Sequence, residues 1–310
     1  LKNTRRKRGF FLRKWDKYFF LRKKVNYSNF STEDMRQKFQ YLTKFRIIPG
    51  GTGAYQFGEQ SFSVAEIEEI IVGSKDMSFE DYVSCRVMNL IVETYFNNAL
   101  FQEVFFSLQA MGVSPFDCLC YIYDHPELYT SKMNKIITQF VDDTSKDLYD
   151  SYEEAVEQTT RPEMVQKYIS GELGVNELLV RRAELYQELE DIAAVLLWAL
   201  RGYLTEKELL EDSVEHYFEE LITFTVCRKK NFDQCEEAIE RAFHYDFKTL
   251  EASEFKVDPR MLLFHQQPLF FTFYYDEAQK KHIRSALGLY TNTPSGLGKL
   301  IQKSNMKKMY

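Results

Sequence analysis

The sequence predicts a mainly α-helical protein with a small β component, an α+β fold. From Met77 onwards, most of the chain divides into short segments that begin with helix caps and place apolar residues at helical spacing. Strand-like patterns are confined to residues 44–74 and to an aromatic run at 268–275. The chain has 310 residues, of which 45% are apolar, so it can fill a core of its own.

The first expected elements are a short helix and two strands. Residues 31–42 carry a Ser-Thr cap and acidic side chains in the first turn, which predicts a helix. In residues 44–49, Phe45 and Ile47 fall on one face and charged side chains on the other, as in a strand. Residues 62–74 are rich in Ile and Val and predict a second strand, although their Glu-Glu pair also suits a helix.

Three glycines between these strands raise the question of a phosphate site. A dinucleotide-binding loop needs a third glycine where Gln56 stands, and a Walker loop needs a Gly-Lys-Ser/Thr ending, which is absent. The segment that follows predicts a strand, which offers no helix N-terminus to an anion. We therefore expect Gly50, Gly51 and Gly53 to adopt positive φ angles in a reversing loop between two strands.

The helical part of the chain has well-marked helix ends. Ser78 caps an apolar segment at 77–98, which predicts a buried helix. The following helix ends on Gly112, and Ser114 with Pro115 opens the next one. Further helices are expected at 130–149, 151–158, 161–170, 176–204, 213–232, 233–245, 276–290 and 292–303, of which 176–204 is the longest.

The cysteines give no metal-binding pattern. Cys118 and Cys120 are two residues apart in a predicted helix, so their side chains point in different directions and core packing explains them better. Cys227 and Cys235 fall on different predicted helices without a CxxC partner. With Cys85 they make an odd total of five, and no secretory signal precedes them, which fits a reducing cytoplasm.

Two His-Glu pairs suggest one metal-binding arrangement. His216 with Glu220, and Glu240 with His244, are each four residues apart and would share a helix face. Facing helices could join them in a two-His, two-Glu site, but di-iron bundles use Glu-x-x-His at a spacing of three, which this chain lacks. Plain surface pairs are the favoured interpretation, and no motif of a serine hydrolase, zinc protease or kinase is present.

Charge is distributed unevenly along the chain. The net charge is −6, yet residues 1–24 hold eleven Lys and Arg side chains against Asp16 alone, interleaved with Phe, Tyr and Trp. Such a segment can bind nucleic acid or an anionic lipid surface. The favoured alternative is a solvated arm, or an element whose acidic partner lies outside the chain.

Several segments resemble one known family. The stretches TKFRIIPGGTGAYQFG (43–58), VAEIEEIIVGSKDMSFEDYVSCRVMNLIVETYFNN (64–98) and LFQEVFFSLQAMGVSPFDCLCYIYDHPELY (100–129) resemble the region after the barrel in cobalamin-binding radical S-adenosylmethionine proteins. The tail FTFYYDEAQKKHIRSALGLYTNTPSGLGKLIQK (271–303) resembles the end of the same proteins. The MSFEDY helix entry is the most recognisable piece, and the resemblance covers most of the chain from about Ser31.

The resemblance implies a C-terminal accessory region that closes the barrel and shapes the substrate cavity, with the first strand pair as the end of the barrel. The CxxxCxxC motif, whose thiolates hold the family's four-iron four-sulfur cluster, is absent, as are the cobalamin-binding and S-adenosylmethionine-binding segments. We therefore assign no catalytic, cofactor-binding or metal residue, and we expect the family's catalytic domains to be the partners. Leu1 in place of a starting Met fits a chain cut from a longer protein. Arg46 and Tyr55 would approach the cavity, although a surface hairpin explains them equally well.

Four parts are expected along the chain: a basic aromatic arm at 1–30, a short helix and a strand pair at 31–76, a helical domain at 77–260, and at 261–310 a strand and two helices that pack on the helical domain. The longest apolar stretch, residues 191–200, is too short for a membrane helix, so we expect a soluble, cytoplasmic protein.

Two other functions stay open. One is an independent interaction module whose arm binds nucleic acid or anionic membrane, and the other is a di-iron helical bundle enzyme. The substrate, the reaction type and the oligomeric state are not indicated.

Overall fold

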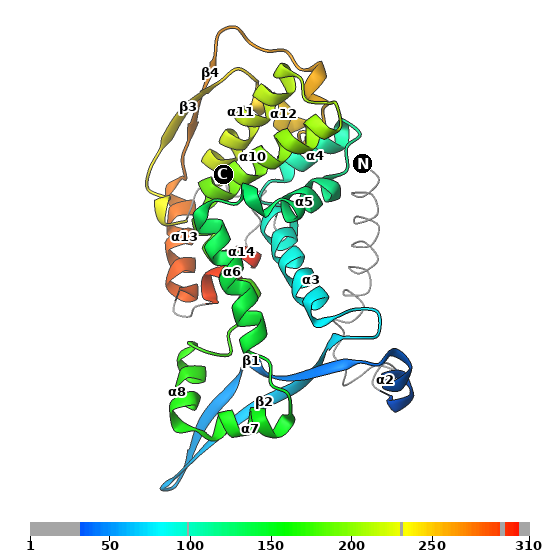
Figure 1. Ribbon diagram of the computed structural model, residues 1–310. Coiled ribbons are helices and arrows are strands. Elements are labelled where there is room, and N and C mark those ends of the chain that lie inside the picture. Colours follow the sequence, from blue (N-terminus) through cyan, green and yellow to red (C-terminus); the bar gives the residue numbers. More distant parts are fainter. Residues whose placement is uncertain (1–31, 98, 230–231, 292–294, 304–310) are drawn as a thin grey trace. The chain divides into compact units, whose positions relative to one another are not determined.

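The structure is a computed structural model that describes residues 32–97, 99–229, 232–291 and 295–303. It is mainly helical, with two antiparallel sheets of two strands each among these residues, so the predicted fold class is confirmed (Figure 1). The basic arm expected at residues 1–30 lies outside the described residues.

The chain divides into two compact units, and each unit is built from two chain segments. Unit 1 contains the described residues of Leu1–Asn89 and Thr138–Leu178, and unit 2 contains those of Leu90–Ile137 and Leu179–Tyr310. The four parts expected from the sequence are each continuous in the chain, whereas these units are not. The chain passes from one unit to the other inside three helices, α3 (Phe79–Val92), α6 (Ser131–Lys146) and α9 (Glu177–Gln187).

Unit 1 is organised around a long β-hairpin. After a short helix, α2 (Glu33–Phe39), strand β1 (Leu42–Phe57) pairs antiparallel with β2 (Gln60–Gly73) (Figure 1). Two short helices pack on the hairpin, α7 (Tyr152–Thr160) on β2 and α8 (Pro162–Ser170) on β1. Both predicted strands and the three predicted short helices are confirmed.

The glycines lie within β1, so the prediction that they form the reversing loop is wrong. The register of β1 against β2 shifts between Ile47 and Thr52, which marks a bulge. Pro49, which has no N–H to donate to the ladder, and Gly50, with a φ of +75°, lie in this bulge. The chain instead reverses at Gly58, where φ is +62°.

A small core joins β2 to the beginning of α3. Ser78 caps α3 as predicted: its Oγ accepts the N–H of Asp81 at 3.2 Å, and Asp81 Oδ2 accepts the N–H of Ser78 at 3.0 Å. The cap fixes the entry of the helix so that its first turns face β2. The buried cluster there consists of Val72, Met77, Tyr82 and Cys85.

Unit 2 is built from helices that pack around α10 and α11. Helix α10 (Leu189–Glu206) packs against α11 (Asp212–Arg228) and α5 (Pro115–Asp124), and α11 packs against α4 (Gln102–Ala110). The caps predicted for α5 are confirmed, since Ser114 Oγ accepts the N–H of Asp117 and Pro115 is the first helical residue. The remaining elements are η3 (Glu93–Asn97), η4 (Pro126–Leu128), η5 (Phe232–Gln234), α12 (Phe247–Ala252), η6 (Pro259–Met261), α13 (Glu277–Tyr290) and α14 (Gly296–Lys303).

The single long helix predicted at 176–204 is two helices. Helix α9 ends at Gln187 and α10 begins at Leu189. Glu188 between them leaves the helical conformation, with φ of −97° and ψ of 46°. Most apolar residues of this segment that fall in α10, among them Leu189, Ile192 and Leu196, are buried.

A strand of a second antiparallel sheet replaces the helix predicted at 233–245. Strand β3 (Ile239–Phe243) pairs antiparallel with β4 (Leu269–Phe273), the aromatic strand that the sequence did predict. The buried ring of Phe243 packs against the rings of Phe224 and Phe271. This non-local packing explains why the helical pattern of the segment is overridden.

Candidate functional site

The distal half of the β1–β2 hairpin presents an aromatic face to solvent. In its register, Tyr55 lies opposite Phe62 and Gly53 opposite Val64. Residues directly opposite, and residues two apart on one strand, share a face of the ribbon. The four apolar side chains therefore lie on the same face; they are Tyr55, Phe57, Phe62 and Val64, and we refer to them as the hairpin surface. All four are exposed, with Phe57 at 81% and Tyr55 at 63%.

The opposite face of the same ribbon is small and polar. It carries Ala54 opposite Ser63 and Thr52 opposite Ala65. This face is turned towards α7, because Ser63 Oγ donates a hydrogen bond to the carbonyl oxygen of Thr159 at 3.3 Å. The unit thus covers the small, polar face of its hairpin and leaves the aromatic face open, which is the reverse of the usual arrangement.

The tyrosine of this surface also protects the backbone of β1. A Cβ built on Gly53 would lie 3.2 Å from Cε2 of Tyr55, so the ring covers the glycine. The hairpin is a two-stranded sheet, and within the described residues its further pairing is a single bridge between Phe45 and Tyr149. A ribbon of two strands with open edges and an exposed aromatic face has the properties of a docking element.

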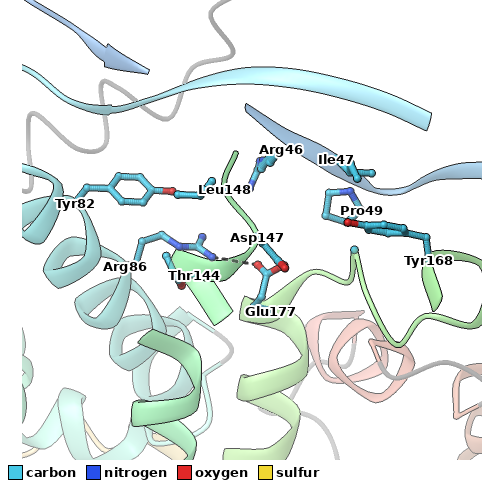
Figure 2. Close-up of a pocket in the computed structure, with 11 residues that line it drawn as sticks. Arg46, Ile47, Pro49, Tyr82, Arg86, Thr144, Asp147, Leu148, Tyr168 and Glu177 are labelled. Atoms are coloured by element: carbon cyan, nitrogen blue, oxygen red, sulfur yellow. Dashed lines mark hydrogen bonds and ion pairs between the residues drawn. The ribbon is translucent and has the colours of Figure 1, made fainter. Parts of the chain in front are cut away.

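A cluster of charged residues surrounds a small cavity in unit 1 (Figure 2). Arg46 of β1 lines the cavity, and its Nη2 lies 2.6 Å from Oε1 of Glu68. Arg86 of α3 points towards Glu177, the first residue of α9, with Nη2 3.4 Å from Oε2 (Figure 2). Asp147, which follows α6, also lines this cavity.

Asp147 is the carboxyl group of this cavity whose titration is shifted. Burial, and then a hydrogen bond with Glu177, raise the pKa of Asp147 to about 8. The hydroxyl groups of Tyr168 and Tyr149 form a hydrogen bond at 3.0 Å. Burial, and to a smaller extent this hydrogen bond, raise the pKa of Tyr168. The cavity measures about 20 Å³, which is room for about one water. The cluster can therefore hold a proton and connect β1, α3 and the ends of α6 and α9, but it has no space for an organic substrate.

Of the two residues expected to approach a substrate cavity, Arg46 lines this small cavity and Tyr55 lies on the hairpin surface. The sequence contained a signal for the hairpin surface that the prediction missed. Apolar residues alternate at 55 and 57 and again at 62 and 64, on both sides of the turn at Gly58.

The residues considered for a di-iron site do not form one. Glu220 binds His244 twice, with Oε1 2.7 Å from Nδ1 and Oε2 2.7 Å from the backbone nitrogen. Glu240 lies in strand β3, so the premise that Glu240 and His244 share a helix face is wrong. Across the part of the chain that the structure describes, no three His, Cys, Asp or Glu side chains are arranged to hold a metal ion.

All five cysteines are buried and none is in a disulfide. Cys118 and Cys120 are buried residues of α5, and burial raises the pKa of the Cys118 thiol to about 12. Cys235 follows η5 and is not helical, unlike the prediction. The cysteines therefore have the character of core residues.

No protein-family model matches the chain, and no curated protein is similar to it. None of the helices that the structure describes is long and apolar enough to cross a membrane.

Proposed function

We propose that this chain is an accessory region that docks through the hairpin surface on the catalytic domains of a cobalamin-dependent radical S-adenosylmethionine enzyme. In that role it closes the open side of the barrel and shapes the cavity that receives the substrate, without catalysing a reaction itself. The observation that carries the proposal is the exposed aromatic face of the β1–β2 hairpin.

Contiguous aromatic surface on a protein commonly marks a contact with another polypeptide. The hairpin surface has this character, because its four apolar side chains lie on one face, and neither strand has a further strand beside its distal half within the described residues. A barrel with an open side has free strand edges, beside which an extended ribbon can pair.

The resemblance described above supplies the identity of the partner. Its most informative stretches, 43–58 and 64–98, correspond to the hairpin and to the capped entry of α3. The hairpin that exposes the aromatic face is therefore one of the elements that carry the resemblance.

The iron–sulfur cluster of that family does not fit the cysteines of this chain. A four-iron four-sulfur cluster needs three accessible thiolates in one place, whereas these five cysteines are buried and no three of them come together. The proposal accordingly assigns the cluster, S-adenosylmethionine and cobalamin to the partner domains.

The test is co-expression of the full chain with a tagged pair of cobalamin-binding and radical S-adenosylmethionine domains from a protein of that family. We expect the two to co-purify, and the variant Phe57→Ser/Phe62→Ser to lose the association. Phe270→Ser is the matched control, because Phe270 is 83% exposed but lies on β4 in unit 2. Co-purification that is insensitive to the hairpin variant, or no association at all, would contradict the proposal, provided that the variant shows wild-type circular dichroism.

A further inference from the structure

Unit 2 contains a larger cavity, and none of the residues that line it belongs to the hairpin surface. Its volume is about 460 Å³, within the range of small-molecule sites. Three elements of unit 2 line it: the end of α11, the helix α12, and the segment from β4 to the beginning of α13.

Aromatic rings form the apolar wall of this cavity. Phe271 and Phe273 are two residues apart on β4, so they share a face of the strand, and their ring centroids are 6.4 Å apart. Phe224 of α11 stands edge-on to both, at 5.7 Å and 5.3 Å. Two of these rings are half-buried and face the cavity without being covered by the core. Such a wall favours a flat apolar ring system as ligand.

Two cations also line the cavity, and only one of them has its charge compensated. Arg228 is buried, stacks on Phe224 at 5.2 Å, and pairs with Glu251 at 3.1 Å. Lys248 of α12 is exposed, and its ammonium has no ion pair or hydrogen bond with any residue that the structure describes.

Asp276, a carboxylate that lines the cavity in addition to Glu251, has a local role. Asp276 caps α13: its Oδ1 accepts the N–H of Gln279 at 2.8 Å, and the Gln279 side chain accepts the N–H of Asp276. Its negative charge is therefore directed at the positive end of that helix. The ammonium of Lys248 remains as the charge available to a ligand.

From these observations we infer that the cavity binds a flat aromatic molecule that carries one carboxylate, with the rings of Phe271 and Phe273 against the aromatic body and Lys248 at the anionic group. The inference goes beyond the proposed docking role and does not depend on it.

Isothermal titration calorimetry on the full chain, without a partner, tests this inference with two probes of equal shape, naphthoate and naphthalenemethanol. We expect naphthoate to bind about fivefold more tightly, which is the upper range for one partly exposed ion pair. In Lys248→Gln this advantage is lost, while in Lys135→Gln, an exposed lysine on α6 in the same unit, it is kept.

The aromatic wall has its own pair of variants. Phe271→Ala should weaken both probes, whereas Phe270→Ala, on the opposite face of β4, should weaken neither. Equal affinity of the two probes in the wild type, an advantage that survives Lys248→Gln, or no binding at millimolar probe would each overturn the inference. Because no partner domain is present in these titrations, failure here leaves the docking proposal untouched, and failure of co-purification leaves this site untouched.

Discussion

The ammonium of Lys229 is fully buried and donates a hydrogen bond to Glu103 Oε2 at 2.7 Å. Lys229 follows α11 and Glu103 lies in the first turn of α4, 126 residues earlier in the chain. The same ammonium donates to the carbonyl oxygens of Ala99 and Leu100 at 2.8 Å each, so its three protons are all used. These hydrogen bonds therefore connect the end of α11 to α4 and to the loop before it.

Loss of this lysine should destabilise unit 2 strongly. Lys229→Met leaves Glu103 buried with Arg228 3.8 Å away as its remaining cation, and removes the donor to two carbonyls. We expect the free energy of unfolding to fall by about 3–5 kcal/mol. Urea unfolding followed by circular dichroism measures this, with Lys135→Met as the exposed control. The double variant Lys229→Met/Glu103→Leu should recover part of the loss, because it removes the unpaired buried charge. A single variant within about 1 kcal/mol of wild type would show that the pair does not hold the two elements.

The carboxyl pair in unit 1 predicts a pH dependence of stability. The folded state raises the pKa of Asp147 from 3.8 to about 8, so it binds this proton more tightly than the unfolded state does. The resulting stabilisation is complete below about pH 4 and is lost as the pH rises towards 8. Glu177 and Asp143 raise this pKa and Arg46 lowers it, and Arg86 and Tyr168 line the same cavity.

Replacement of Asp147 by Asn removes this titration. The stability advantage of wild type over Asp147→Asn should therefore shrink by at least about 1 kcal/mol between about pH 5 and about pH 8. Asp142→Asn, an exposed carboxyl on α6, should show no such change. The comparison needs urea unfolding of three proteins at two pH values. A constant difference between wild type and Asp147→Asn would mean that the proton is not held in the folded state.

Two glycines of unit 2 predict opposite effects of the same substitution. A Cβ at Gly298 of α14 would overlap the carbonyl oxygen of Leu179, and the carbonyl of Gly298 accepts a hydrogen bond from Arg182 at 2.6 Å. Gly298→Ala should lower the melting temperature and cost about 1–3 kcal/mol. A Cβ at Gly288 of α13 meets nothing within 4 Å, so Gly288→Ala should stabilise by roughly 0.5–1 kcal/mol. Thermal unfolding of both variants measures the two effects. Equal changes in melting temperature would contradict the close packing of α14.

The features that were predictable from the sequence are those fixed by neighbouring residues. The caps at Ser78 and Ser114 depend on side chains within three positions of the helix start, and both are present. The strand pair at the start of the described chain was predictable for the same reason, since alternation is a local pattern.

The features that the sequence missed depend on distant partners. The bulge at Gly50 and the turn at Gly58 are set by the register of β1 against β2, and a glycine cluster alone does not distinguish a bulge from a turn. Strand β3 forms because it pairs with β4, about thirty residues later. The raised pKa of Asp147 requires the chain after α6 to be buried beside Glu177 of α9, whereas the sequence shows both carboxyls as ordinary surface acids.

The docking role of the hairpin surface is tested most directly by site-specific photocrosslinking. Benzoylphenylalanine is placed at Phe57, or at Phe270 as control, in the full chain co-expressed with the cobalamin-binding and radical S-adenosylmethionine domains. A crosslink to those domains from position 57 and none from position 270 is the expected result. No crosslink from position 57, or equal crosslinking from both positions, would contradict docking through the aromatic face of the hairpin.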